Sequence, residues 1–193
     1  MCEQSQAETL KEELFKNSKN GYFRAQSDDI DGAYDFCEGY AAFLNANKTE
    51  RLFAKGAVAL AQQHGFVAFE KGKVYQPGDK IYVLHRNKAV LLCVLGSDPV
   101  VNGVQIAASH IDSPRLDLKP NPVYESGELA YFKTHYYGGI KKYQWTAMPL
   151  ALYGVVVKAD GSQVEVRLGD QPGDPRFVIT DLLPHLGVEQ SKR

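Results

Sequence analysis

The first part of the chain has apolar side chains at three- to four-residue spacing, which is typical of amphipathic helices. One such segment covers residues 8–17, and a second has its apolar stripe at residues 30–44. Thr49 can cap a third helix, whose apolar stripe covers residues 53–61 and which Gly65 terminates. The pattern therefore predicts three helices near the start of the chain.

The pattern then changes to β-rich runs. Residues 81–86 and 89–95 are two such runs, separated by Asn87-Lys88, which predicts a tight hairpin. A third run, residues 104–109, is almost wholly apolar, as expected for a central strand covered on both faces. We therefore expect helices packed on a sheet that delivers His110 at one of its edges.

Beyond Pro114 the pattern is that of a second, β-rich module. Residues 115–119 alternate strictly between apolar and polar, and Pro120 and Pro122 are expected to end this strand. Asp160-Gly161 predicts a turn between the last two strands. No strong helical pattern appears in this part of the chain. Three further strands are predicted, at residues 129–134, 150–158 and 163–168.

The composition excludes several classes of protein. The 22 basic residues nearly balance the 23 acidic ones, so charge gives no reason to expect nucleic acid or an anionic membrane as partner. The three cysteines are far apart and form no CxxC pair, which argues against a zinc knuckle or a disulfide framework. The start of the chain lacks a signal-peptide pattern, and the apolar run at residues 147–157 is too short to span a bilayer. We therefore expect a cytoplasmic protein.

A histidine and an aspartate two positions apart follow the predicted central strand, in His110-Ile111-Asp112-Ser113-Pro114. A neutral imidazole binds Zn²⁺ through one ring nitrogen, while a nearby carboxylate accepts the N–H of the other. In α/β proteins, functional side chains collect at the C-terminal ends of strands. The spacing suits a metal ligand at His110, and it also suits a strand-end histidine bonded to a local turn.

Other candidate ligands are weaker. A zinc hydrolase needs at least three ligands and a general base. Surface positions or local hydrogen bonds explain the remaining histidines more simply, and residues 170–175 predict a turn because they lack the ligand spacing of an EF-hand. The glycines at 138–139 have no phosphate-binding spacing, and they predict a positive φ or a close backbone approach instead. The remaining candidates are His135, His185, Asp170, Asp174 and Asp181.

Two longer motifs resemble a known family. Residues 107–120, Ala-Ala-Ser-His-Ile-Asp-Ser-Pro-Arg-Leu-Asp-Leu-Lys-Pro, resemble the zinc-binding segment of the aspartyl aminopeptidase and aminopeptidase I family of cocatalytic zinc metallopeptidases. Residues 136–145, followed by Pro149-Leu150, resemble the glycine-rich stretch of that family's inserted domain. The likeness covers nearly the whole chain. Two motifs in the same order are far more specific than a His-x-Asp alone.

The resemblance implies a function and site residues. His110 would be the first zinc ligand, and Asp112 would be the catalytic carboxylate that orients it. The activity would be removal of N-terminal residues from peptides by a site with two zinc ions. The protein would be a homo-oligomer built from dimers, dodecameric in the family.

The resemblance also implies a domain plan within the α/β class. Residues 1–112 would be the N-terminal part of the peptidase domain, with helices on a mixed sheet. Residues 113–193 would be an incomplete, β-rich inserted oligomerisation domain. The boundary coincides with the change of pattern after residue 112.

Two departures from the family pattern limit these expectations. Many relatives carry a histidine beside the tryptophan that reaches a neighbouring subunit. Here Gln144 precedes Trp145, and an amide cannot donate as an imidazolium does, although both residues remain candidates for an inter-subunit or substrate contact. The family's other zinc ligands and its general base follow the inserted domain, whereas this sequence stops at Arg193. We therefore expect a truncated N-terminal portion that is inactive alone.

Two alternatives stay open. The chain could be a non-catalytic assembly module related to such peptidases, with His110 as a vestige. Alternatively, zinc could be bound at a subunit interface by His110 together with His135 or His185.

Overall fold

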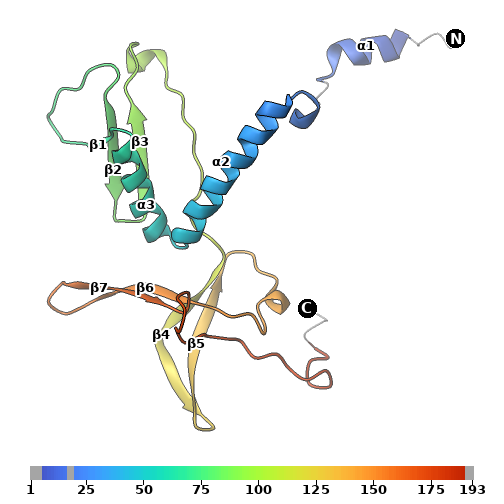
Figure 1. Cartoon of the computed structure of the whole chain (residues 1–193), viewed down its shortest axis with the longest axis vertical. Coiled ribbons are helices and arrows are strands. Elements are labelled where there is room, and N and C mark those ends of the chain that lie inside the picture. The colour runs from blue at the N-terminus through green and yellow to red at the C-terminus, as the bar shows by residue number, and fades with distance from the viewer. Residues whose placement is uncertain (1–5, 17–19, 190–193) are drawn as a thin grey trace. The chain divides into compact units, whose positions relative to one another are not determined.

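The computed structural model describes residues 6–16 and 20–189 (Figure 1), and the chain divides into two units between residues 48 and 49. The first unit contains α1 (Gln6–Leu14), a short 3₁₀ helix η1 (Gly21–Phe23) and α2 (Ser27–Ala46). The start of α2 is stabilised by the side chain of Asp29, which accepts a hydrogen bond from the Gln26 amide at 3.0 Å. Both helices predicted here are confirmed, with slightly different bounds.

In the second unit, α3 (Glu50–Gln63) packs on a small sheet. The sheet consists of β1 (Val67–Ala68), β2 (Lys80–His85) and β3 (Ala89–Val94), in the order β1-β2-β3. The predicted helix cap is confirmed, because Thr49 Oγ1 accepts a hydrogen bond from the Leu52 amide at 3.3 Å. Gly65 follows the helix with a φ of 83°, a backbone conformation that glycine adopts without strain.

The hairpin between β2 and β3 is also confirmed. The strands are antiparallel, with His85 opposite Ala89. Arg86 and Asn87 have φ values of 50° and 56°, as a type I′ turn requires at its two central positions. The turn is therefore centred one residue earlier than the sequence pattern predicts.

The predicted central strand at residues 104–109 is not present. These residues adopt no regular secondary structure, and the side chains of Val104 and Ile106 are 63% and 81% exposed. A strand of this composition needs hydrogen-bonding neighbours and a packed layer on each face, and the described residues provide neither. His110 therefore lies in an irregular segment rather than at a strand end.

The next two strands, β4 (Arg115–Ser126) and β5 (Leu129–Tyr137), form a long antiparallel ribbon. The prediction that prolines end β4 was wrong. Pro120 and Pro122 lie within a register shift between Leu118 and Val123, where the ladder is interrupted. Because β4 pairs with β5 alone among the described residues, the missing N–H groups at the prolines break no ladder hydrogen bond.

The last ribbon consists of β6 (Leu152–Val157) and β7 (Gln163–Leu168), which pair antiparallel. The predicted turn between them is confirmed, and Asp160 Oδ1 accepts a hydrogen bond from the Ser162 amide at 2.9 Å. Beyond residue 112, the described chain contains no α-helix, and its only helical piece there is the 3₁₀ helix η3 (Lys142–Gln144). The fold is thus mixed α/β with small sheets.

The described residues bury very few apolar side chains, namely Ala54, Ala61 and Ile81. Ala54 and Ala61 lie on α3 and Ile81 lies on β2, so the packing of α3 on the small sheet is the core of the second unit. No helix within residues 6–16 and 20–189 is long and apolar enough to cross a membrane.

Candidate metal-ligand site

His110 and Asp112 lie in contact. The side chain of His110 is 83% exposed, and its Nδ1 lies 3.1 Å from Asp112 Oδ1 and 3.0 Å from the Asp112 carbonyl oxygen. With its proton on Nδ1, the ring donates to both oxygens, which leaves the lone pair of Nε2 available. Nε2 has no hydrogen bond to any residue of the described chain. The structure therefore brings together the two residues that the sequence singles out, in an arrangement suited to a metal ligand and its orienting carboxylate.

The Asp112 carboxylate has a second partner, Tyr137 at the end of β5. A hydrogen bond with the Tyr137 side chain is the largest cause that lowers the pKa of Asp112, followed by the backbone of Asp112 itself, with a smaller effect from His110. The same interaction raises the pKa of the Tyr137 hydroxyl. Asp112 therefore remains ionised at neutral pH and can accept a hydrogen bond from His110.

Arg115, the first residue of β4, holds Tyr137 from the other side. The two residues are register partners in the ribbon, and the guanidinium carbon lies 3.9 Å from the centre of the Tyr137 ring. Arg115 Nε donates to Asp117 Oδ1 at 2.7 Å. Its Nη1 lies 2.9 Å from Glu50 Oε1, an ion pair without hydrogen-bond geometry. Burial lowers the pKa of Arg115, but the hydrogen bond to Asp117 and the charge of Glu50 raise it by more.

No sequence pattern singles out Tyr137, Arg115 or Glu50 as part of this site. The alternation of residues 115–119 does place Arg115 and Asp117 on one face of a strand, which was a usable signal. The other contacts depend on the register of the β4–β5 ribbon and on the position of the first turn of α3. Neither can be read from spacing along the chain.

Gly138 follows Tyr137 and turns the chain away from β5. Its φ is 80°, which confirms the predicted positive φ at this position, whereas Gly139 does not have a positive φ. A side-chain carbon at this position would lie 3.6 Å from Pro114 Cα, an ordinary contact distance, so the backbone conformation rather than lack of space favours glycine. This contact places residues 137–138 against the segment that links Asp112 to β4.

The other candidate ligands do not join His110. Within the described residues, no group of three or more His, Cys, Asp or Glu side chains could hold a metal ion. His135 stacks on the ring of Tyr136, with ring centres 5.4 Å apart, and His185 lies exposed in a turn. The described residues could therefore supply one ligand of a zinc site, and they do not provide a complete ligand set.

The three remaining aspartates accept hydrogen bonds from nearby residues. Asp174 Oδ2 accepts hydrogen bonds from two backbone amides of its turn, at 2.8 and 3.1 Å, which lowers its pKa. Asp170 binds Arg167 and Tyr153, and Asp181 accepts from the next amide. The predicted turn at residues 170–175 is confirmed.

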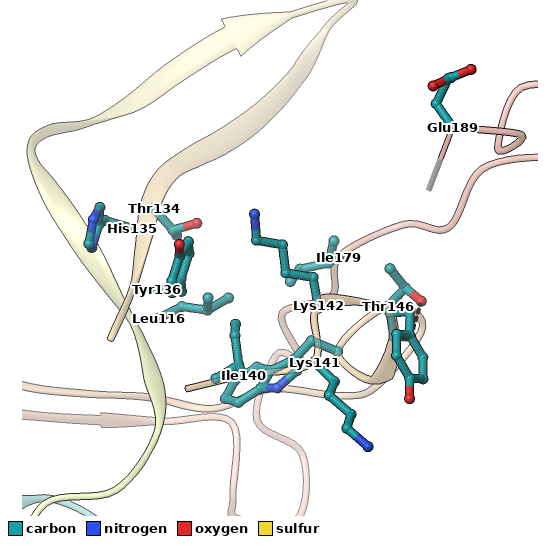
Figure 2. A pocket seen from close by; sticks show the side chains of 12 residues that line it. Leu116, Thr134, His135, Tyr136, Ile140, Lys141, Lys142, Thr146, Ile179 and Glu189 are labelled. Atoms are coloured by element: carbon teal, nitrogen blue, oxygen red, sulfur yellow. Dashed lines mark hydrogen bonds between the residues drawn. The ribbon is translucent and has the colours of Figure 1, made fainter. Parts of the chain in front are cut away.

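A cavity of about 1020 Å³ lies beside β5 (Figure 2). Leu116 and Tyr136 line it and face each other across the ribbon. Because successive side chains of a strand point to opposite faces, Leu116 and Tyr136 lie on the face of the ribbon opposite to the Arg115–Tyr137 pair. Trp145, predicted to contact substrate or a neighbouring subunit, is half-buried and lines this cavity, whereas Gln144 is exposed.

Comparison with known proteins identifies the family. The family described as aminopeptidase I zinc metalloprotease (M18) matches residues 43–193. The probable M18 family aminopeptidase 1 of Borrelia garinii is 44% identical over 177 residues, which are 91% of this chain and 39% of that protein. The counterpart of Clostridium acetobutylicum is 40% identical over 185 residues, 94% of this chain and 40% of that protein.

A solved structure gives the same result. The crystal structure of aminopeptidase I from Borrelia burgdorferi matches with a TM-score of 0.80 and 42% identity, over 86% of this chain and 41% of that one. The chain thus spans about two fifths of the length of these relatives. These matches confirm the resemblance carried by the two sequence motifs: the chain belongs to the aminopeptidase I (M18) family of zinc metalloproteases.

Proposed function

We propose that this chain is the part of a zinc aminopeptidase that supplies one zinc ligand, His110, and the carboxylate that orients it, Asp112. The observation that carries the proposal is the contact of His110 Nδ1 with Asp112, 3.1 Å from Oδ1, on a ring whose other nitrogen is exposed. Asp112 holds the proton on Nδ1, so that Nε2 presents a lone pair outward. A zinc ion, when bound, polarises the carbonyl of the scissile peptide bond and activates water.

The reaction proposed for the whole protein is hydrolysis of the first peptide bond of a peptide substrate. Within the described residues, His110 and Asp112 belong to no group of three or more His, Cys, Asp or Glu side chains that could hold a metal ion. We therefore propose that the other zinc ligands and the general base lie in the region that the relatives contain and this chain does not span. The chain alone is expected to be inactive.

We further propose the domain plan and assembly that the family suggests. Residues 1–112 belong to the peptidase domain, and residues 113–193 to a β-rich domain that mediates homo-oligomerisation in the cytoplasm, with Gln144 and Trp145 near a subunit or substrate contact. A structure described as a dodecamer, that of mApe1 from S. cerevisiae, shares the fold at 20% identity and a TM-score of 0.65. The β-rich character of β4 to β7 supports this plan.

The test is a chimera. The segment of the Clostridium acetobutylicum relative that aligns with this chain is replaced by the chain itself, and zinc content and hydrolysis of aminoacyl-nitroanilides are measured. We expect an active zinc enzyme, and we expect Asp112→Asn to weaken zinc binding by roughly 10- to 100-fold. His110→Ala should abolish both zinc binding at this position and turnover. His135→Ala, the matched control, should do neither.

The opposite results would contradict the proposal. A folded chimera with His110→Ala that keeps full zinc content and full turnover would show that His110 is not a ligand. Robust turnover by the 193-residue chain alone would show that the chain completes a site by itself.

A further inference from the structure

We propose that the cavity beside β5 binds a small carboxylic acid with an apolar body, and that Lys142 and Thr134 contact its carboxylate group. This inference goes beyond the proposed zinc role of His110 and does not depend on it. The volume of the cavity, about 1020 Å³, is at the upper end of the range for small-molecule sites. Such sites are mostly apolar and contain a few polar groups that fix the orientation of the ligand.

Apolar side chains form most of the lining of the cavity. They come from the β4–β5 ribbon, from the segment after β5 and from a segment near the end of the described chain, and they are Leu116, Tyr136, Ile140, Trp145 and Ile179. Apolar ligand surface that is buried against such walls contributes roughly 25 cal/mol per Å². The lining therefore favours a ligand with an apolar body over a fully polar one.

Backbone hydrogen bonds join two of these walls. The Ala147 amide donates to the Ile179 carbonyl oxygen at 2.8 Å, next to a β-bridge between Thr146 and Ile179. Thr146 Oγ1 donates to the Tyr143 carbonyl oxygen at 3.1 Å. These bonds hold the segment that carries Trp145 against the segment that carries Ile179. This part of the cavity is therefore formed without a ligand.

Lys142 supplies a positive charge at the cavity. Its ammonium group lies 4.9 Å from the centre of the Tyr136 ring, and within residues 6–16 and 20–189 it forms no ion pair. Figure 2 shows the Lys142 side chain extending toward Tyr136, whereas the Lys141 side chain points away from it. A cation beside an apolar wall, without a carboxylate partner, suits the anionic group of a ligand.

Thr134 offers a hydroxyl group on the same side. Thr134 and Tyr136 are two positions apart on β5, so their side chains project from one face of the strand. In Figure 2 the Thr134 hydroxyl points toward the Lys142 ammonium, and a hydroxyl can donate to a carboxylate. Glu189 is the acidic residue of the lining, and its carboxylate points away from Lys142 in Figure 2. The charge presented beside β5 is therefore positive.

Tryptophan fluorescence tests the proposal, because Trp145 is the only tryptophan of the chain and lines the cavity. The 193-residue chain is titrated with octanoate, with 3-phenylpropanoate, and with octanamide as an uncharged analogue of octanoate. We expect a saturable change with at least one of the two acids, which shows whether the site takes an aliphatic or an aromatic body. Octanamide should bind about fivefold more weakly than octanoate, the upper value for a solvent-exposed ion pair.

Variants at two positions test the contact with the carboxylate. Lys142→Gln should weaken binding of the acid about fivefold and leave octanamide binding unchanged. Lys141→Gln removes the same charge from the neighbouring residue and is the matched control, which should leave both unchanged. Tyr136→Leu removes the ring beside the Lys142 ammonium and should also weaken binding of the acid, whereas Tyr136→Phe keeps the ring and should restore it.

Several results would overturn the proposal. They are the absence of a saturable change with either acid at millimolar concentration, octanamide binding as tight as that of octanoate, and equal losses in Lys141→Gln and Lys142→Gln. Circular dichroism identifies a variant that fails to fold. In that case Thr134→Val decides, because it removes a hydroxyl at nearly constant shape. It should weaken binding of the acid about twofold and leave octanamide binding unchanged, and an unchanged affinity for the acid would contradict the proposed contact.

Discussion

Among the single residues, Asp170 has the most strongly perturbed carboxylate. Arg167 donates to its Oδ2 from Nε and Nη2, at 2.9 and 2.7 Å, and the Tyr153 hydroxyl donates to the same oxygen. These hydrogen bonds, those from Arg167 first, hold the pKa of Asp170 far below its ordinary value of 3.8. A carboxylate with a depressed folded-state pKa stabilises the folded chain above its unfolded pKa, and this contribution is lost as the pH falls below it.

We predict that Asp170→Asn lowers the urea midpoint of unfolding at neutral pH. In the variant, this midpoint should also fall less steeply than in the wild type as the pH is lowered. The difference between wild type and variant should shrink as the pH falls from about 5 to about 2, where the wild-type carboxylate loses its advantage. Asp98→Asn, which removes the same charge from an exposed loop, should run parallel to the wild type. Parallel curves for Asp170→Asn as well would show that the cluster contributes nothing to stability.

Contacts between residues close together in the sequence could be predicted from the sequence alone, whereas contacts between distant residues could not. His110 and Asp112 are two positions apart, so the chemistry of an imidazole and a carboxylate was sufficient to predict their contact. The contacts of Tyr137 with Arg115 and of Arg115 with Glu50 depend on strand register and on the packing of α3. Local spacing carries no information on either.

At the scale of elements, features with a local cause were predictable. The cap at Thr49, the stop at Gly65 and the turn before β3 each follow from the conformational preference of one or two residues. The strand expected at residues 104–109 depends on neighbours, and the described chain lacks them. The prolines of β4 were misjudged for a related reason, because a register shift that accommodates them is a property of the pair of strands.

The cap of α3 gives a prediction at this scale. Thr49→Ala removes the side-chain acceptor for the Leu52 amide and should lower the free energy of unfolding by about 1 kcal/mol. Thr49→Ser keeps the acceptor and should cost much less. Urea unfolding followed by circular dichroism measures both. Equal losses for alanine and serine would show that the hydroxyl is not what stabilises the helix start.

For the whole molecule, the balance of buried and exposed apolar surface is unusual. Only three apolar side chains of the described residues are buried, two on α3 and one on β2. The segment after β3 exposes a run of large apolar side chains, Val100, Val101, Val104 and Ile106. Exposed apolar surface of this kind favours association, because each buried square ångström contributes roughly 25 cal/mol. The chain spans about two fifths of the length of its relatives.

Because residues 100–106 expose these apolar side chains, the 193-residue chain should associate with itself. Sedimentation velocity at micromolar concentrations is expected to show dimers or larger species whose share grows with concentration. Ile106→Lys should reduce association, because it places a charge in an exposed apolar run, without loss of circular dichroism. Gln105→Lys adds the same charge at the neighbouring exposed position and should have a smaller effect. A wild-type monomer at every concentration, or equal effects of the two lysines, would show that residues 100–106 do not drive association.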